Sequence, residues 1–224
     1  MGKSAFYAVS IGQKVITALA GLFLMTFLAV HLATNLLLIK GDGGASFREA
    51  VRFLTTSPII KVMEVVLFSA FIIHIVLALF VTLKNWLARP VGYFVARKSN
   101  TYFMSRYMFH TGMILLAFLL IHLWHFFAIK AGLQPQPDFM ESKVDFYPQA
   151  VYLFQKPIVS AFYLVSFIFL GFHLNHALQS GFQTLGLNHN RYTPVVKIIS
   201  ALYSVVISVG FAVIPLYFLF FFEP

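Results

Sequence analysis

The sequence predicts an all-α integral membrane protein, a bundle of five transmembrane helices that forms one domain over residues 1–224. Composition is the first reason: 60% of the 224 residues are hydrophobic and 10% are charged. The mean hydropathy of +0.85 exceeds what a soluble domain of this length needs to fill its core. The second reason is that apolar residues gather in five runs. Each run can cross a hydrocarbon core of about 30 Å, which takes about 20 helical residues.

The five runs follow one another along the chain. Lys3 and Lys14 precede the first run, as basic residues precede a signal peptide. Its length exceeds the usual 7 to 15 or so residues of a signal core, so we expect a retained helix at 15–39. The other four helices are predicted at 59–83, 107–129, 158–181 and 198–221.

Two shorter segments have helical character without the length to span a membrane. Ser46 is followed three residues later by Glu49, which is a capping-box pattern at a helix start. Apolar residues then recur on one helical face, which predicts a short helix lying on the membrane surface. These residues are Phe47, Ala50, Val51 and Leu54. A second interfacial helix is expected at 147–154, between proline breaks.

The distribution of charge predicts the orientation. One side of the membrane would carry the N-terminus and the loops 84–106 and 182–197, which contain basic residues and no acidic one. The positive-inside rule makes this side cytoplasmic, so the C-terminus would lie outside the cell inner membrane. The net charge of +9 therefore indicates topology rather than nucleic-acid binding. The basic residues of this side are Lys3, Lys14, Lys84, Arg89, Arg97, Lys98, Arg106, Arg191 and Lys197.

Four of the predicted helices carry a histidine at nearly the same distance from their start. Because successive helices cross in opposite directions, His31 and His122 fall nearer the outer face, and His74 and His173 nearer the cytoplasm. Ionisable side chains inside a bilayer are costly, and four at matched depths are hard to assign to packing. A zinc site needs ligands that converge at one depth. Two layers suit two bis-histidine haems, because imidazole is the usual axial ligand of haem iron.

The absence of cysteine limits the cofactor chemistry. It excludes a cysteine-ligated iron–sulfur cluster, covalent haem attachment through Cys-x-x-Cys-His and a thiolate nucleophile. A redox cofactor must therefore be held by histidine, without a covalent link, or belong to a partner protein.

Short segments around the four histidines resemble, in order and spacing, the dihaem cytochrome b membrane-anchor subunit of succinate:quinone oxidoreductases. This complex II family includes the quinol:fumarate reductases, and the similarity covers essentially the whole chain. The segments are FLAVHL at 27–32, FIIH at 71–74, IHLW at 121–124 and GFHLNH at 171–176.

The resemblance implies specific ligands, cofactors and partners. His31 and His122 would hold the iron of the outer, distal haem b, and His74 and His173 that of the inner, proximal one. A flavoprotein subunit and an iron–sulfur subunit would dock on the cytoplasmic face. The chain would pass electrons to or from quinone, usually menaquinone in dihaem members, in a respiratory succinate dehydrogenase or fumarate reductase. It offers no flavin fold and no dicarboxylate site, so it would not oxidise succinate itself.

Other histidines and two glycines compete for roles at these sites. His125 and His176 each follow a candidate ligand by three residues, so either can share a helix face with it or replace it. Their depth also suits hydrogen bonds to haem propionates or quinone, or ordinary packing. His110 and His189 are expected at the surface. Gly21 and Gly112 precede His31 and His122 by ten residues; contact between helices is the favoured role, and room for a haem ring is the alternative.

Two acidic residues lie near the predicted site. Glu49 resembles in placement a carboxylate that some fumarate reductases use to move protons at a quinone site near the distal haem, although the capping box with Ser46 is favoured. Glu64 lies within the second helix, where an unpaired charge is costly. It is protonated, paired with Lys61 or part of a proton path.

A rival interpretation from another functional class is a proton or ion transporter in which the histidines form a relay without haem. Such a protein is expected to have polar residues between the two histidine layers and broken helices near the midplane. The sequence has few such residues, and its helical runs are continuous. Electron transfer is therefore the favoured function.

Overall fold

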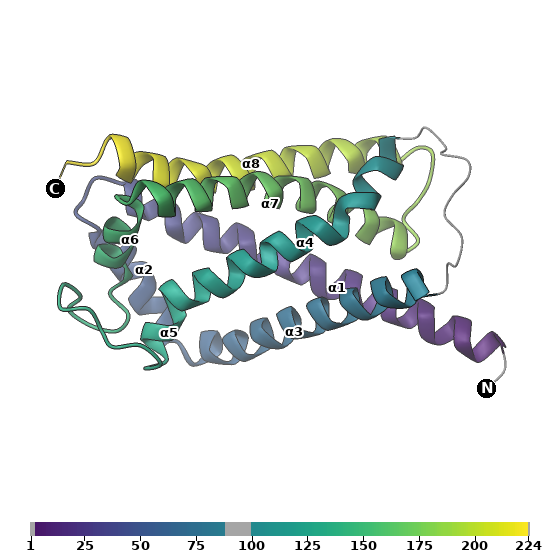
Figure 1. The fold of residues 1–224 in the computed structure, drawn as a ribbon, viewed down its shortest axis with the longest axis horizontal. Coiled ribbons are helices and arrows are strands. Elements are labelled where there is room, and N and C mark those ends of the chain that lie inside the picture. Colours follow the sequence, from purple (N-terminus) through teal and green to yellow (C-terminus); the bar gives the residue numbers. More distant parts are fainter. Residues whose placement is uncertain (1–2, 88–99, 224) are drawn as a thin grey trace.

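The computed structural model describes residues 3–87 and 100–223 (Figure 1). This part of the chain folds into eight α-helices and one 3-10 turn, with no β-strand. The elements are α1 (Lys3–Leu36), η1 (Leu37–Ile39), α2 (Ala45–Thr56), α3 (Pro58–Leu87), α4 (Asn100–His125), α5 (Phe127–Lys130), α6 (Phe146–Phe154), α7 (Pro157–Thr184) and α8 (Thr193–Phe220).

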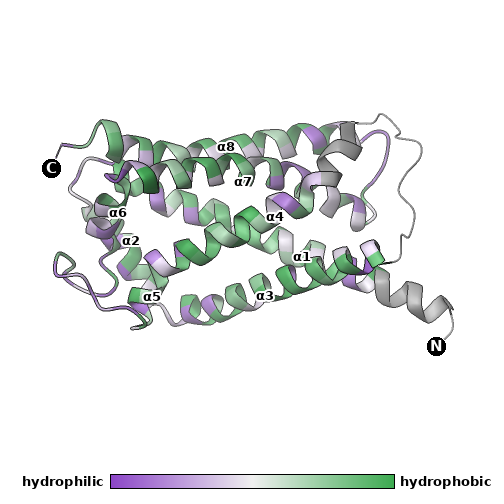
Figure 2. Cartoon of the chain, viewed as in Figure 1, coloured by the Kyte–Doolittle hydropathy of each residue, from purple (hydrophilic) through white to green (hydrophobic). Residues whose placement is uncertain are grey.

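Five of the helices are long and apolar enough to cross a membrane, which confirms the predicted fold class. Figure 2 shows these helices as predominantly hydrophobic where they are coloured by hydropathy. The protein is therefore a multi-pass membrane protein. The apolar spans are Ile11–Ile39, Pro58–Lys84, Tyr107–His125, Pro157–Thr184 and Thr193–Phe220.

Helix ends differ from the prediction at α1 and α4. Both helices start before their apolar run, at Lys3 and Asn100 rather than at 15 and 107. Hydropathy marks where a helix enters the membrane, but a polar segment without proline can extend the helix further. The predicted third helix is interrupted at Phe126, and the chain then resumes as α5. Arg89, Arg97 and Lys98 of the predicted cytoplasmic loop lie outside the described residues.

The bundle has two distinct ends (Figure 1). The N-terminus and the turn between α7 and α8 lie at one end. The short helices α2, α5 and α6 and the C-terminus lie at the other. The two short helices predicted at 46–54 and 147–154 are present as α2 and α6, and their place on the membrane surface stays a prediction.

The start of α2 corrects the predicted capping box. Gly44 occupies the N-cap position with a φ of 84°, and Ser46 already lies inside the helix. The carboxylate of Asp42 accepts hydrogen bonds from the backbone N–H groups of Gly44 and Ser46, each at 3.1 Å. The hydrogen bond from Ser46 holds the pKa of Asp42 below its usual value. Glu49 is left exposed on α2.

Packing is uneven around the bundle. Helix α1 packs against α3, α7 and α8, and α4 packs mainly against α7. Helices α7 and α8 pack closely because small residues face each other: a Cβ added at Gly171 would lie 2.8 Å from Ser208 Oγ. Helices α3 and α4 each pack on a different neighbour, and both contribute to the wall of a partly open cavity.

Candidate functional site

The structure brings His31 of α1 and His122 of α4 together inside the bundle. Their ring centroids are 5.9 Å apart and their ring planes are nearly perpendicular, at 84°. Both residues line one cavity, and we call them the cavity histidines. Two side chains that are far apart in the sequence therefore line the same cavity, as expected from their predicted depth.

The cavity beside these histidines has a volume of about 490 Å³. That lies within the range of about 300–1,000 Å³ that is usual for ligand pockets. Its walls come from α1, η1, α2, α3, α4, α6, α7 and α8, and they are mostly aliphatic and aromatic. The cavity suits a large apolar ligand.

A phenylalanine one helical turn earlier supports each cavity histidine. Phe27 stacks on the ring of His31 at 5.2 Å and 19°, and Phe118 stacks on that of His122 at 5.7 Å and 23°. Residues four apart lie on the same helix face. Each imidazole is therefore in contact with an aromatic ring one turn earlier on its own helix, which restricts the orientation of the imidazole.

Helices α2 and α6 close one end of the cavity, and we call this pair the roof. Arg48 Nε of α2 donates to Asp145 Oδ1, at the start of α6, over 2.8 Å. The guanidinium also lies 5.0 Å from the centre of the Tyr147 ring, and burial raises the pKa of Tyr147. Gly44 makes room for that ring, since an added Cβ would lie 2.3 Å from it. The roof is thus fixed by one ion pair and one ring contact.

His74 and His173 lie nearer the other end, each against a glycine of the neighbouring helix. A Cβ added at Gly21 would lie 3.3 Å from His74 Cε1, and one at Gly112 would lie 3.6 Å from His173 Cε1. We call this second pair the glycine-facing histidines. Both glycines precede a cavity histidine by ten residues, or about 15 Å of helix, so the two layers agree with the predicted depths.

The two layers are organised differently. Neither His74 nor His173 lines the cavity. Unlike the cavity histidines, they make no ring contact with each other among the described residues. Gly21 and Gly112 lie where two helices contact each other, their favoured role, and the side chain that each meets is an imidazole. A Cβ at Gly21 would be tight against its ring, whereas one at Gly112 would make ordinary van der Waals contact.

Hydrogen bonds define the tautomers of the glycine-facing histidines. His74 Nδ1 lies 3.3 Å from Thr17 O, a carbonyl that can only accept, so Nδ1 carries the hydrogen. The Thr111 hydroxyl donates to Met108 O over 3.0 Å, so it accepts from His173 Nδ1 at 3.2 Å. In both rings the lone pair of Nε2 is left free. This is the nitrogen that a metal can bind when Nδ1 is the donor.

The competing histidines have other surroundings. His125 Nδ1 lies 3.0 Å from the Tyr163 hydroxyl, and its carbonyl accepts from Gln149 Nε2 at 2.9 Å. His125 does not itself line the cavity, but its partner Tyr163 does. His176 is half-buried one turn beyond His173 and does not line the cavity either.

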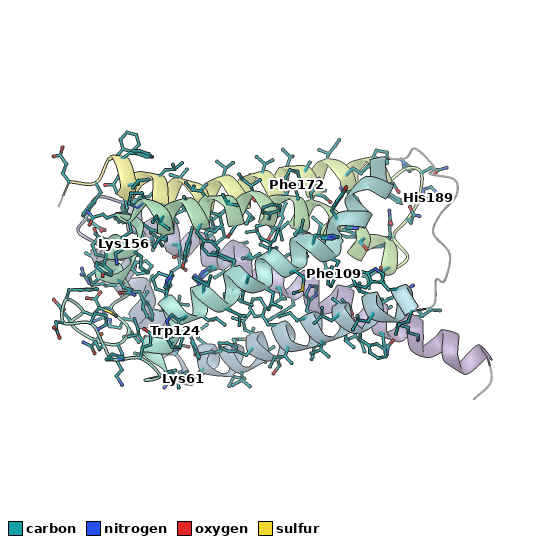
Figure 3. The ribbon with its side chains drawn as sticks, in the orientation of Figure 1. Lys61, Phe109, Trp124, Lys156, Phe172 and His189 are labelled. Atoms are coloured by element: carbon teal, nitrogen blue, oxygen red, sulfur yellow. The ribbon has the colours of Figure 1, made fainter. Side chains whose placement is uncertain are left out.

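The two surface histidines are confirmed as exposed. His110 lies beside Tyr107 and Phe109 on α4. His189 lies in the turn between α7 and α8, at the end of the bundle opposite Lys61 and Lys156 (Figure 3).

The structure also places the two acidic residues Glu64 and Glu49. Glu64 pairs with Lys130 of α5, at 2.8 Å and 2.7 Å from its two carboxylate oxygens, rather than with Lys61. The sequence could not predict this pair, because it depends on the break after α4. Glu49 is exposed and is not among the residues that line the cavity, so its role at a quinone site stays a prediction.

Sequence reasoning missed two polar residues near the cavity histidines. Asn35 Nδ2 lies 3.3 Å from His31 Nδ1. Its spacing of four residues from His31 could have indicated this contact. Tyr163 of α7 is 2% exposed, and its ring lies beside that of His122. No local sequence signal connects Tyr163 to α4.

No family model, curated protein or solved structure matches the chain. Over residues 3–87 and 100–223, no three histidine or carboxylate side chains gather closely enough to hold a metal ion by themselves. The ligating groups that the described chain offers are thus single pairs of imidazoles at two depths. Such an arrangement can bind a metal only where the metal's other ligands come from elsewhere, as in a macrocycle.

Proposed function

We propose that the chain is the membrane-anchor cytochrome b subunit of a succinate:quinone oxidoreductase, acting as succinate dehydrogenase or fumarate reductase. It binds two b-type haems and passes electrons between an iron–sulfur subunit and quinone, with menaquinone as the expected type. The cavity histidines His31 and His122 hold the distal haem. The glycine-facing histidines His74 and His173 hold the proximal one.

The observation that carries the proposal is the 5.9 Å between the ring centroids of His31 and His122. That spacing leaves room for one metal ion that both imidazoles would bind, each over about 2.0 Å. The ring nitrogens of His31 and His122 would together hold the iron of a haem, which would supply one-electron chemistry there.

The surroundings fit the same group. A haem is large, flat and mostly apolar, and the cavity of about 490 Å³ is lined by aliphatic and aromatic side chains. In the second layer, the hydrogen bonds of His74 and His173 leave Nε2 as the free ligating nitrogen. Gly21 and Gly112 keep a side chain out of the space beside each ring.

The residues of the chain bind the haem, orient the histidine rings and shield them from water. A bound haem supplies reversible one-electron oxidation and reduction of its iron, tuned by ligands and burial. The apolar walls and the roof exclude water from the cavity histidines, while Phe27 and Phe118 hold their rings in place. Thr17 and Thr111 orient the other two rings through Nδ1.

The orientation follows from the charge pattern, and the partners are those that the family resemblance implies. The end with the N-terminus and the turn between α7 and α8 faces the cytoplasm by the positive-inside rule. The iron–sulfur and flavoprotein subunits dock there. The roof and the C-terminus then lie on the outer side of the cell inner membrane, and quinone reacts within the lipid.

The relay transporter is not favoured by any specific observation. That function expects helices broken near the midplane. Helices α3, α7 and α8 each run through their apolar span, and α1 changes to the 3-10 turn η1 only in the last three residues of its span. The interruption at Phe126 likewise follows His125 at the end of the α4 span.

The proposal is tested by the haem content of the purified chain and of four single variants. After expression with sufficient haem, the chain is expected to hold two low-spin b-type haems. His31→Ala, His74→Ala, His122→Ala and His173→Ala should each lose one of the two. His189→Ala, at an exposed loop position, is the matched control and should keep both. A wild-type chain without b-type absorbance, or four variants that keep both low-spin signals, would overturn the proposal.

A further inference from the structure

The surroundings of the nitrogen Nδ1 differ among the four candidate ligands. It faces a backbone carbonyl in His74 and a hydroxyl in His173. It is buried without a partner in His122. Only in His31 does it face a side-chain amide, because Asn35 Nδ2 lies 3.3 Å from His31 Nδ1. The same Nδ2 donates to the carbonyl of His31 at 2.7 Å.

An amide differs from the other partners because it can either donate or accept. With Nδ2 toward the ring, Asn35 favours a neutral His31 whose hydrogen sits on Nε2, so Nε2 has no lone pair to give. Rotation of the amide about χ2 exchanges nitrogen and oxygen. Oδ1 then accepts from Nδ1–H and leaves Nε2 free to bind a metal. The rotation gives up the hydrogen bond to the His31 carbonyl, and the amide must also turn about χ1 so that Oδ1 does not face that carbonyl oxygen.

We propose that Asn35 is a positioning residue that selects the metal-binding tautomer of His31 and thereby sets the potential of the haem held by His31 and His122. The inference rests on the proposed function. Asn35 also lines the cavity, so its amide has space to rotate beside the ring. An acceptor on Nδ1–H makes an imidazole a stronger electron donor, as in carboxylate–histidine–metal pairs. A stronger donor stabilises ferric over ferrous iron and lowers the potential.

We expect two substitutions of Asn35 to shift the midpoint potential of this haem in opposite directions. Asn35→Leu removes the acceptor, so the midpoint potential of this haem should rise. Asn35→Asp supplies an acceptor that is stronger and cannot donate when ionised, so the potential should fall. A tenfold change in the ratio of ferric to ferrous affinity corresponds to about 59 mV for one electron. We expect a shift of at least that size in each direction.

The control is Thr34→Val. Thr34 lines the same cavity next to Asn35, but its hydroxyl donates to Val30 O at 3.1 Å and not to a histidine. This variant should leave both potentials unchanged. The experiment is a redox titration of both haems in the purified chain, with low-spin resonance spectra. The haem of the cavity layer is identified as the signal that His122→Ala loses.

The outcomes separate the inference from the proposed function. If the wild-type chain holds no haem, the proposed function fails and this inference fails with it. If two haems are present but Asn35→Leu and Asn35→Asp shift the potential in the same direction, Asn35 has only a packing role and the inference is overturned. It is also overturned if neither variant shifts the potential, or if both haems shift equally.

Discussion

The two histidine layers contain the same residue type at nearly the same offset in their helices, yet the fold treats them differently. His31 and His122 face each other beside a large apolar cavity, and each is stacked on a phenylalanine of its own helix. His74 and His173 are held against the next helix by a glycine and a hydrogen bond. Equal spacing in the sequence therefore fixes depth in the bundle but leaves the surroundings of a ligand undetermined.

The difference suggests two ways to prepare a metal ligand. In the cavity layer, aromatic rings restrict the imidazoles while Nδ1 has an adaptable partner in His31 and none in His122. In the other layer, a fixed acceptor sets the tautomer of each ring. The first layer should therefore respond to changes at Nδ1 through His31 alone, whereas either ring of the second should respond to the loss of its acceptor.

The largest expected effect comes from filling the space beside the glycine-facing histidines. Gly21→Leu or Gly112→Leu places a branched side chain where a Cβ alone would already lie 3.3 Å or 3.6 Å from the imidazole. We expect loss of one of the two haems, that of the second layer, while the cavity layer keeps its low-spin signal. Haem content and resonance spectra of the purified variants measure this.

The matched control for that change is Gly12→Leu, because nothing lies within 4 Å of a Cβ at Gly12 on the same helix as Gly21. It should retain both haems. Loss of the cavity-layer signal in Gly21→Leu would show that the two layers are not independent.

The roof offers the next largest effect. Gly41 and Gly44 have nearly the same left-handed φ, 80° and 84°, but only Gly44 faces the Tyr147 ring. Gly41→Ala should cost about 1–2 kcal/mol of unfolding free energy through backbone strain. Gly44→Ala should add about 1–3 kcal/mol for overpacking. Thermal unfolding in detergent measures the difference, and haem release should accelerate only from the cavity layer. Equal unfolding temperatures for the two variants would argue against Tyr147 as a fixed part of the roof.

A smaller effect is expected at Thr111. Thr111→Val removes the acceptor of His173 Nδ1–H, and a buried donor left unpaired costs about 1–2 kcal/mol. The potential of the second-layer haem should rise, since its ligand becomes a weaker electron donor. Thr184→Val is the control, because the Thr184 hydroxyl donates to Ser180 O of its own helix. A shift in the cavity-layer potential instead would contradict the assignment of His173 to the second layer.

The smallest effect is expected at the ion pair between Glu64 and Lys130. Both side chains are about a third exposed, at 32% and 29%. Glu64→Gln should therefore change the unfolding free energy by less than about 1 kcal/mol and leave both haems in place. Lys61→Gln, at an exposed position without a role in the pair, is the comparison. A lost haem in Glu64→Gln would indicate that Glu64 acts at a site and not only between α3 and α5.

Particular elements show why some features could be predicted. The five membrane spans could be predicted from the sequence because a helix that crosses lipid needs a long uninterrupted apolar run. The presence of helix α2 could be predicted because its apolar residues recur with the period of an α-helix. The start of α2 was predicted wrongly, because Asp42 and not Ser46 provides the side-chain acceptor. The partner of Glu64 was missed because Lys130 approaches it only through the turn after α4.

The sequence by itself determined the membrane fold, the two short helices and the depth of the four histidines. Depth follows directly from it, because a helix rises about 1.5 Å per residue and the apolar run marks where each helix enters the bilayer. Only the tertiary structure decided what each imidazole meets: the stacked Phe27 and Phe118, the room left by Gly21 and Gly112, and the amide of Asn35. These contacts depend on the rotation and packing of helices distant in the chain, and residue spacing does not encode that rotation.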